Sequence, residues 1–488
     1  MSDILRSLQP KEVFHYFEEI SKIPRGSGDE KRISDYMVEF AKNLGLEVVQ
    51  DESYNVYIKK AATPGYEHVP GVILQGHLDM VCEKNNDTEH DFTKEGLDLY
   101  IDGDWIKAKG TTLGADNGVA IAYQMAILSD NTLKHPQIEC LMTTDEERGM
   151  TGVKNLHPEH LSGKILLNLD SDAEGEFFLS CAGGAKTSLK IPVSKSTLND
   201  GMDVYVISIK GLKGGHSGAE IHLERANAHI LMGRVLNELR KETTFELIDV
   251  IGGSKDNVIT RECEVIIAIS PQDKQVLKNK IEDMYQVFRV EYMSQEPDLS
   301  LEIISQVKSN QYTVINQEAL EKLIDALTII PNGVMGYDVN MKGLVQTSLN
   351  LGVLNLKDTH LELGSAVRSS MGTKKQEVIN KLQALTSILG IDFEVKGDYP
   401  EWQYNPSSRI RECAEEVYKE MYGKEAVMTA IHAGLECGFI AEKINGLDMI
   451  SFGPNVRDIH SPQEAVSISS MARVYEYVVK LLENLVAY

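Results

Sequence analysis

The pair His77 and Asp79 is the first feature of this sequence that could carry chemistry. It follows the apolar run Val72–Leu74 and Gly76, a pattern typical of a buried strand. In an extended backbone, side chains two residues apart point to the same side. An imidazole beside a carboxylate can bind a metal ion while the acid orients the ring. For this segment alone, a structural histidine beside a capping aspartate is an equally ordinary interpretation.

Acidic residues follow or precede three other apolar segments. Asp116 precedes the run Val119–Leu128, whose apolar residues recur at helical spacing, so a helix N-cap is the simplest interpretation there. Residues 145–147 (Asp-Glu-Glu) directly follow a buried-strand pattern, and these acids repel one another unless a cation is near or the turn is solvated. Asp170 and Asp172 follow another such pattern, and we favour Asp170 because it is the first acid after the strand.

Short apolar runs that alternate with helical patterns predict an α/β sheet around these residues. The expected strands of the first part are 48–50, 55–59, 72–76, 138–142 and 165–169, with helices at 10–22, 28–43 and 119–128 and a polar loop over 83–112. In open α/β sheets, ligand sites lie beyond the carboxyl ends of the strands. The candidate residues fall at those ends.

Length and composition predict two domains. A chain of 488 residues exceeds one typical core, and its character changes after about residue 183. We expect a catalytic domain from residues 1–183 and 400–488, interrupted by an inserted α+β domain at 184–399 that could be two related halves. The expected elements of the insert are strands 203–209, 257–269, 300–306, 345–354 and 360–367, and helices 220–240, 272–290, 316–328 and 373–388.

Charge and cysteine content exclude several functional classes. The chain has 49 basic and 73 acidic residues, a net charge of −24, which argues against binding to nucleic acid or an anionic membrane surface. It has no apolar run long enough to suggest a membrane span. The 6 cysteines are scattered, without a CxxC pair, as expected for reduced thiols of a cytoplasmic protein.

The strand-end residues and one late histidine form a chemically coherent set. Two imidazoles and three carboxylates without a thiolate suit Zn²⁺ or a similar divalent ion. Five ligands exceed one open tetrahedral site, but they suffice for two ions if one carboxylate bridges. Two ions about 3.5–4 Å apart can activate water and clamp a carbonyl oxygen. The set is His77, Asp116, Glu147, Asp170 and His460.

Four motifs resemble those of the co-catalytic zinc exopeptidases, a family that includes carboxypeptidase G, the aminoacylases and peptidase V. The resemblance covers essentially the whole chain and is strongest to the bacterial aminoacyl-histidine (Xaa-His, or cytosol non-specific) dipeptidases. Met80-Val81-Cys82 stands where many members have Thr-Val-Pro, which favours the dipeptidase branch. The implied fold is a phosphorylase/hydrolase-like catalytic domain with a mixed sheet and an inserted lid. The motifs are His77–Val81, Gly114–Gly118, Asp145–Gly149 and Asn168–Asp172.

The resemblance implies a role for each ligand of a two-zinc centre. Asp116 would bridge the ions, with His77 and Asp170 on one ion and Glu147 and His460 on the other. Co²⁺ or Mn²⁺ is expected to substitute for zinc. We hold the assignment of terminal ligands to particular ions open.

The insert carries further candidates. His216, within Gly214–Gly218, resembles the family's lid histidine, which donates to the oxyanion of the tetrahedral intermediate. Arg368 suits the terminal carboxylate of a substrate, although a surface arginine at a strand end is the competing interpretation. Asn257 is a second substrate-binding candidate. Beyond the insert, Gly434 lies in a segment that resembles the family's glycine-rich turn near the substrate.

The implied activity is that of a dipeptidase whose small peptide substrates include Xaa-His and carnosine-like dipeptides. Glu146 would act as general base and then general acid, and Asp79 would fix the tautomer of His77. The alternatives are an N-acyl-amino-acid deacylase or a tripeptidase with the same metal centre, and a binding protein on an inactive hydrolase scaffold. A binding protein on an inactive scaffold would be expected to lack some of the metal ligands, and this sequence lacks none of the five. A homodimer, with His216 acting across it, is compatible with the sequence.

Overall fold

The computed structural model describes residues 4–307 and 312–488, which form two compact units. Unit 1 consists of the chain up to Ser180 together with Trp402–Ala430 and Leu435–Tyr488. Unit 2 consists of Cys181–Glu401 and the short segment Ile431–Gly434. The chain therefore leaves unit 1 twice, first for a long insert and then for a short segment, and it ends in unit 1.

Unit 1 is built on an 8-stranded mixed sheet in the order β1-β2-β6-β3-β7-β23-β8-β22. The central strand β3 lies parallel to β6 and β7, and β7 lies parallel to β23. Strands β3, β6 and β7 are buried along their whole length, as their apolar runs predict. The strands are β1 Glu47–Gln50, β2 Val56–Lys60, β3 Val72–His77, β6 Ile138–Thr143, β7 Ile165–Asn168, β8 Glu176–Cys181, β22 Val427–Ile431 and β23 Asp448–Ser451.

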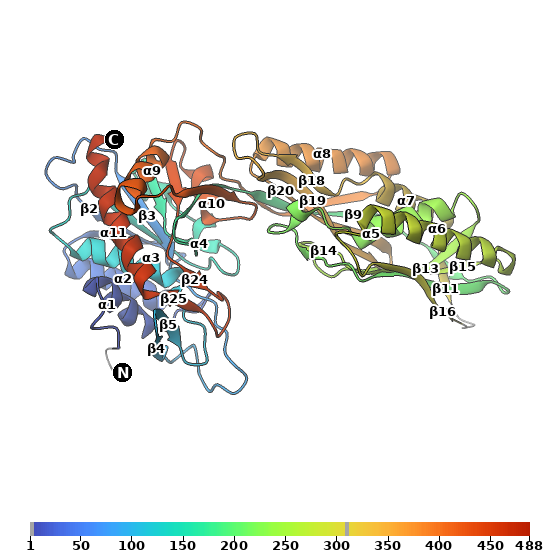
Figure 1. Cartoon of the computed structure of the whole chain (residues 1–488), viewed down its shortest axis with the longest axis horizontal. Helices are drawn as coiled ribbons and strands as arrows, with labels where there is room; N and C mark the ends of the chain where they lie inside the picture. The colour runs from blue at the N-terminus through green and yellow to red at the C-terminus, as the bar shows by residue number, and fades with distance from the viewer. Residues whose placement is uncertain (1–3, 308–311) are drawn as a thin grey trace. The chain divides into compact units, whose positions relative to one another are not determined.

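Helices and a second small sheet surround the unit 1 sheet (Figure 1). Helix α3 packs on β3, α1 packs on α3, and α9 packs against α11. The region 83–112, expected to be a loop, contains a hairpin of β4 and β5 that turns at Gly103-Asp104, where Gly103 has a φ of 62°. The elements are α1 Lys11–Ser21, α2 Lys31–Asn43, α3 Ala115–Ser129, α4 Thr151–Lys154, α9 Arg409–Tyr422, α10 Glu436–Lys443, α11 Ile468–Asn484, β4 Leu99–Asp102, β5 Trp105–Ala108, β24 Val456–Arg457 and β25 Ala465–Ser467.

Unit 2 is built on a 9-stranded sheet in the order β16-β11-β15-β13-β19-β20-β9-β21, with β18 paired to β19. Among the described residues, strands β13 and β19 are joined only by the pairs Ile251 with Asn355 and Gly252 with Leu354. Helices α5 to α8 lie along one side of this sheet in Figure 1. The elements are β9 Gly183–Pro192, β11 Asp203–Lys210, β13 Phe245–Gly252, β15 Cys263–Ile269, β16 Ser300–Val307, β18 Gly333–Tyr337, β19 Val345–Leu356, β20 His360–Ser369, β21 Asp392–Tyr399, α5 Ala228–Leu239, α6 Lys274–Tyr292, α7 Gln317–Ile329 and α8 Gly372–Leu389.

Two expected elements of unit 2 are divided in the structure. The helix expected over 220–240 begins only at Ala228, because the Asn227 side chain accepts from the amides of His229 and Ile230 and caps α5 there. The strand expected over 257–269 is β14 (Val258–Ile259) and then β15, since the carbonyl of Thr260 accepts from Ala228 N instead of joining the sheet. Short β12 (Gly215–His216) pairs with β14, and β10 (Lys195–Thr197) pairs with β17 (Thr313–Ile315).

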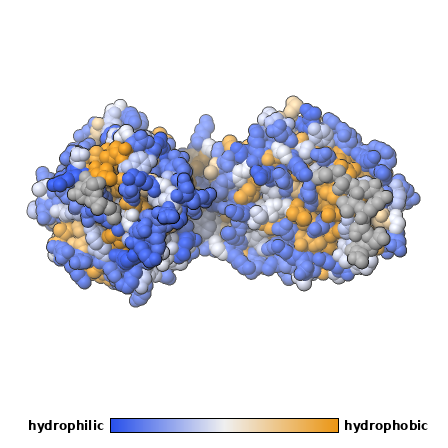
Figure 2. Space-filling model, turned by 90° about the horizontal axis from the view of Figure 1, so that it is seen from below, coloured by the Kyte–Doolittle hydropathy of each residue, from blue (hydrophilic) through white to orange (hydrophobic). Residues whose placement is uncertain are grey.

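The surface is largely polar. The face seen in Figure 2 is mostly hydrophilic, with smaller hydrophobic patches among the polar residues. Among the described residues, no helix has both the length and the apolar character needed to cross a membrane.

Candidate functional site

Three neighbouring parallel strands deliver the first candidates to one edge of the unit 1 sheet. His77 is the last residue of β3, Glu146 and Glu147 follow the end of β6, and Asp170 follows the end of β7. Because these strands run parallel, their carboxyl ends lie side by side. The buried strands thus position a polar layer at the edge where ligands bind in open α/β sheets.

His77 lies between two carboxylates. Its Nε2 atom is 3.1 Å from Oδ1 of Asp116 and 3.6 Å from Oδ1 of Asp170. Burial acts to lower the pKa of His77, but the charge of Asp170 and the hydrogen bond with Asp116 outweigh it and raise the pKa. Asp172, the rival to Asp170, is an exposed residue. The geometry therefore favours Asp170 over Asp172.

A second ligand set adjoins the first through the same aspartate. His460 Nε2 lies 2.9 Å from Oε2 of Glu147 and 3.5 Å from Oδ2 of Asp116. Hydrogen bonds with Asp116 and Glu147 raise the pKa of His460 to about 10. The two oxygens of Asp116 thus face two different imidazoles, the arrangement expected of a bridging carboxylate.

The spacing of these atoms fits bound divalent ions. The donor atoms of His77, Asp116 and Asp170, and those of Asp116, Glu147 and His460, each lie within 4.8 Å of one another. Ligand atoms about 2.0–2.2 Å from a tetrahedral ion lie about 3.3–3.6 Å apart. Of the distances between imidazole nitrogens and carboxylate oxygens, those of 3.5 and 3.6 Å match that spacing and those of 2.9 and 3.1 Å are hydrogen-bond distances slightly below it. The nitrogen and oxygen donors suit zinc. We call these five residues, with Asp116 shared, the metal cluster.

Asp79 connects His77 to the acidic turn after β6. Its carboxylate lies 3.3 Å from His77 Nδ1 and accepts from Ser27 Oγ at 2.7 Å and from the amides of Glu146 and Glu147 at 3.1 and 3.3 Å. Burial would raise the pKa of Asp79, but its hydrogen bonds and the charge of His77 lower it to about 2. Asp79 therefore stays ionised and fixes both the imidazole ring and the backbone of the acidic turn.

Glu146 has a different environment from its neighbour Glu147. Burial, assisted by the charges of Glu436 and Glu147 against the opposing effect of His77, raises the pKa of Glu146 to about 8. One donor atom of Glu146 also lies within 4.8 Å of donor atoms of His77 and Glu147. A carboxyl group that titrates near neutral pH is suited to proton transfer.

Arg368 is the centre of a second group of polar residues, all in unit 2. Its Nη1 donates to the hydroxyl of Tyr399 at 3.0 Å, and its β20 position pairs with Ser348 of β19. Ser348 Oγ lies 2.7 Å from Nε2 of His432. Burial and Arg368 lower the pKa of His432 to about 3, so this imidazole is neutral. With His216, these residues form what we call the arginine cluster.

The arrangement of His216 defines its tautomer. Its Nδ1 accepts from the amides of Gly218 and Ala219, both at 3.2 Å, so the proton of the neutral ring is on Nε2. Burial and the charge of Arg368 lower the pKa of His216. His216 therefore presents an N–H donor from a neutral ring.

The two remaining sequence candidates, Asn257 and Gly434, lie near this cluster as backbone supports. The carbonyl of Asn257 accepts from Ser217 N at 2.9 Å, next to His216. A Cβ at Gly434 would lie 2.8 Å from Cε2 of Tyr399, so the absence of a side chain makes room for the tyrosine ring.

Sequence reasoning missed four residues beside the candidates, of which Arg25, Glu436 and Glu464 are buried and Tyr399 is half-buried. Tyr399 gave no signal except its place at the end of an unpredicted strand. Glu436 accepts from Gln75 Nε2 at 2.6 Å and Thr143 Oγ1 at 2.7 Å, and burial raises its pKa to about 7. Arg25 and Glu464 contact the segment that leads to Asp116. A buried charge at a long sequence distance from its partner leaves no local pattern.

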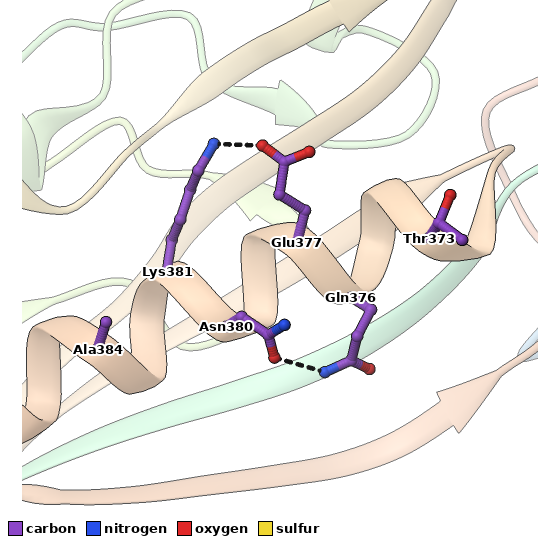
Figure 3. Close-up of a pocket in the computed structure, with 6 residues that line it drawn as sticks. All are labelled: Thr373, Gln376, Glu377, Asn380, Lys381 and Ala384. Atoms are coloured by element: carbon purple, nitrogen blue, oxygen red, sulfur yellow. Dashed lines mark hydrogen bonds and ion pairs between the residues drawn. The ribbon is translucent and has the colours of Figure 1, made fainter.

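A surface hollow along α8 offers no comparable chemistry. Its lining residues all come from this one helix (Figure 3) and are Thr373, Gln376, Glu377, Asn380, Lys381 and Ala384. Lys381 donates to Glu377 at 2.7 Å and Gln376 donates to Asn380 at 2.9 Å. These groups pair with one another along the helix surface, as i,i+4 side chains commonly do.

Comparisons with known proteins identify relatives of this chain. A family model described as peptidase family M20/M25/M40 matches residues 73–484. The chain is 38% identical over 483 residues to the cytosol non-specific dipeptidase of Escherichia coli (strain K12), covering 99% of each chain. It is 38% identical to the crystal structure of aminoacylhistidine dipeptidase from Vibrio alginolyticus, with a TM-score of 0.95 over 98% of this chain and 97% of that one. The aminopeptidase PepT from Bacillus cereus ATCC 10987 shares the fold at 16% identity and a TM-score of 0.56, covering 98% of this chain and 99% of that one.

Proposed function

The chain belongs to peptidase family M20/M25/M40, and we propose that it is a zinc-dependent dipeptidase that hydrolyses unblocked dipeptides, Xaa-His dipeptides among them. The observation that carries the proposal is the position of Asp116, whose two oxygens face His77 and His460 in two adjoining ligand sets. The Escherichia coli and Vibrio alginolyticus relatives, both named as dipeptidases, support the choice among peptidases.

In this proposal the metal cluster holds two ions. His77 and Asp170 would hold one and Glu147 and His460 the other, with Asp116 shared by the two ligand sets. Two bound divalent ions would polarise the substrate carbonyl and make a water molecule more acidic. Asp79 orients His77 through Nδ1 so that Nε2 faces the cluster.

Glu146 is the proposed general base and general acid. It takes a proton from the attacking water and delivers it to the nitrogen of the leaving amine. Its amide donates to Asp79 at 3.1 Å, which fixes the backbone beside the cluster. The amide of Glu147 donates the adjacent hydrogen bond to Asp79, so the two neighbours share one support while their side chains are given different roles.

The arginine cluster is proposed to bind the substrate. His216 donates its Nε2 hydrogen to the carbonyl oxygen as negative charge develops there. Arg368 binds the terminal carboxylate, for which a guanidinium is suited, while Asn257 and Gly434 shape the surrounding backbone. We place the activity in the cytoplasm, in line with the name of the Escherichia coli relative.

A substrate panel tests the proposal. The zinc-loaded protein is incubated with a series of dipeptides that includes Xaa-His and carnosine-like compounds, an N-acetyl amino acid and a tripeptide, and release of free amine is followed. We expect the unblocked dipeptides to be cleaved fastest. Preference for the N-acetyl compound would establish a deacylase, and preference for the longer peptide would establish a tripeptidase.

A further inference from the structure

Glu464 is a buried carboxylate that the proposed reaction does not use. It is 3% exposed, and it accepts hydrogen bonds from four consecutive amides. Leu113 and Gly114 donate to Oε2 at 2.7 and 2.9 Å, while Ala115 and Asp116 donate to Oε1 at 2.8 and 3.3 Å. One side chain thus holds the whole segment that leads to the shared ligand of the metal cluster.

Arg25 holds the same segment by donating to a backbone carbonyl of that segment. Its buried guanidinium donates through Nη2 to the carbonyl of Gly114 and through Nη1 to the carbonyls of Leu78 and Asp79, both at 3.0 Å. The φ of Gly114 is 66°, and a Cβ there would lie 2.5 Å from Nη2 of Arg25, so the contact requires glycine. Arg25 therefore ties the loop after His77 to the segment before Asp116.

The side chain of Asp116 does not hold this segment itself. Its oxygens face His77 and His460, and a capping aspartate bonds amides two or three residues after itself, not the ones before it. Glu464 therefore satisfies the amides of residues 113–116 from a distant part of the sequence.

The same carboxylate connects Asp116 to the segment that carries His460. Glu464 follows His460 by four positions, and its amide donates to the carbonyl of Ser461 at 3.1 Å. Two ligands of one set therefore depend on one short contact between segments that are far apart in the chain.

We propose that Glu464 and Arg25 are positioning residues that hold residues 113–116 so that Asp116 faces both imidazoles, and that they thereby determine the affinity of the two-ion site. This inference rests on the metal role proposed for Asp116. Partners that orient metal ligands typically contribute about 10–100-fold to metal affinity, and we expect an effect of that size.

The experiment compares Glu464→Gln with the wild-type protein by titrating Co²⁺ into the metal-free forms and recording the visible absorption spectrum. A glutamine offers one acceptor oxygen where four amides need partners, and its own N–H groups face donors. We expect at least about tenfold weaker Co²⁺ binding, with far-UV circular dichroism that shows a folded protein. Wild-type affinity in the variant would overturn the proposal.

Glu139→Gln is the matched control. Glu139 is 1% exposed and accepts from the amides of Ser162 and Gly163, at 2.9 and 3.0 Å, at the opposite end of β6. We expect a comparable loss of stability and unchanged Co²⁺ affinity. If Glu139→Gln weakens Co²⁺ binding as much as Glu464→Gln, general destabilisation explains both results and the inference fails.

Arg25→Lys provides an independent variant if Glu464→Gln does not fold. Lysine keeps the charge, but one ammonium group cannot span the carbonyls that the guanidinium reaches on two loops. We expect the same loss of Co²⁺ affinity, and wild-type affinity would overturn the proposal. Failure of the wild-type protein to bind two ions would instead count against the proposed function.

Discussion

The metal cluster of unit 1 surrounds imidazoles with carboxylates, whereas the arginine cluster of unit 2 surrounds a guanidinium with imidazoles. In unit 1 the neighbouring acids raise the pKa values of His77 and His460. In unit 2 burial and Arg368 lower the pKa values of His216 and His432. The charge beside each histidine thus shifts its pKa in opposite directions in the two clusters.

The two clusters also differ in how their polar atoms are satisfied. Asp79 accepts four hydrogen bonds or close contacts, and each oxygen of Asp116 faces an imidazole. Among the described residues, Nε of Arg368 is buried without a hydrogen-bond partner. A buried donor without a partner is unfavourable unless a ligand satisfies it. The difference is in keeping with the proposal that unit 1 binds cations and unit 2 binds an anionic group.

The largest effect is expected from the acidic turn of unit 1. Glu146→Gln removes the proton-transfer group, so we expect kcat to fall about 10²–10⁴-fold while zinc content stays at two ions. Glu147→Gln should lose zinc as well as activity, because it removes a ligand. Elemental analysis and initial rates on the same preparations check both. Equal zinc loss in the two variants would mean that the neighbours do not have separate roles.

A smaller loss is expected from the donor of unit 2. His216→Ala removes one hydrogen bond to the developing oxyanion, which typically lowers kcat about 10²–10³-fold, and zinc content should not change. Mixing His216→Ala with Glu146→Gln subunits then shows which chain supplies the histidine. Recovered activity would place it across a homodimer. Near wild-type kcat for His216→Ala would remove unit 2 from the chemistry.

Arg368 is expected to affect substrate binding more than turnover. Arg368→Lys loses the bidentate contact with a carboxylate, which is worth about 1.5–3 kcal/mol. We therefore expect kcat/KM to fall about 10–150-fold. A dipeptide with an amidated C-terminus should show a similar loss with the wild-type protein. The amide should then be cleaved equally by the variant and the wild type. If the variant still discriminates between acid and amide, the carboxylate is bound elsewhere.

The smallest effect concerns acid stability. The pKa of His432 is about 3 in the folded protein and about 6.5 in an unfolded chain, so the unfolded state binds a proton first as pH falls. The free energy of unfolding should therefore decrease below pH 6.5, by up to about 1.4 kcal/mol per pH unit from this group. Urea denaturation of the metal-free His432→Gln variant should show a shallower decrease. An unchanged slope would contradict a buried neutral imidazole.

The sequence predicted the family and the α/β fold, and both are confirmed by the close structural match and the family model. The prediction worked where burial is continuous, since β3, β6 and β7 are buried along their whole length. It was wrong where a local bond ends an element, as at Asn227, or where a tight turn makes a hairpin in a polar stretch, as at Gly103. Those outcomes depend on a single residue rather than on the hydrophobic periodicity of the segment.

The site residues fall into the same two groups, those that a local sequence pattern marks and those that it does not. The candidates at strand ends could be proposed because each follows an apolar run, and the structure brings the five members of the metal cluster together. Glu464 and Arg25 could not be proposed, because the amides and carbonyls they hold are 350 and 89 residues away at Gly114. Their roles, like those of the ligands, stay predictions until metal binding is measured.

The interrupted path of unit 1 has a consequence for biosynthesis. Strand β23 lies between β7 and β8, so the sheet cannot close until residues 448–451 have left the ribosome. At about 5–20 residues per second, β7 waits on the order of 15–60 s for this partner, with one hydrogen-bonding edge uncovered. Unit 2, nearly continuous in sequence, can fold during that interval. We therefore expect that, in nascent chains stalled before residue 448, unit 2 is resistant to protease. The first segment of unit 1, up to Ser180, should still be sensitive to protease and bound by chaperones.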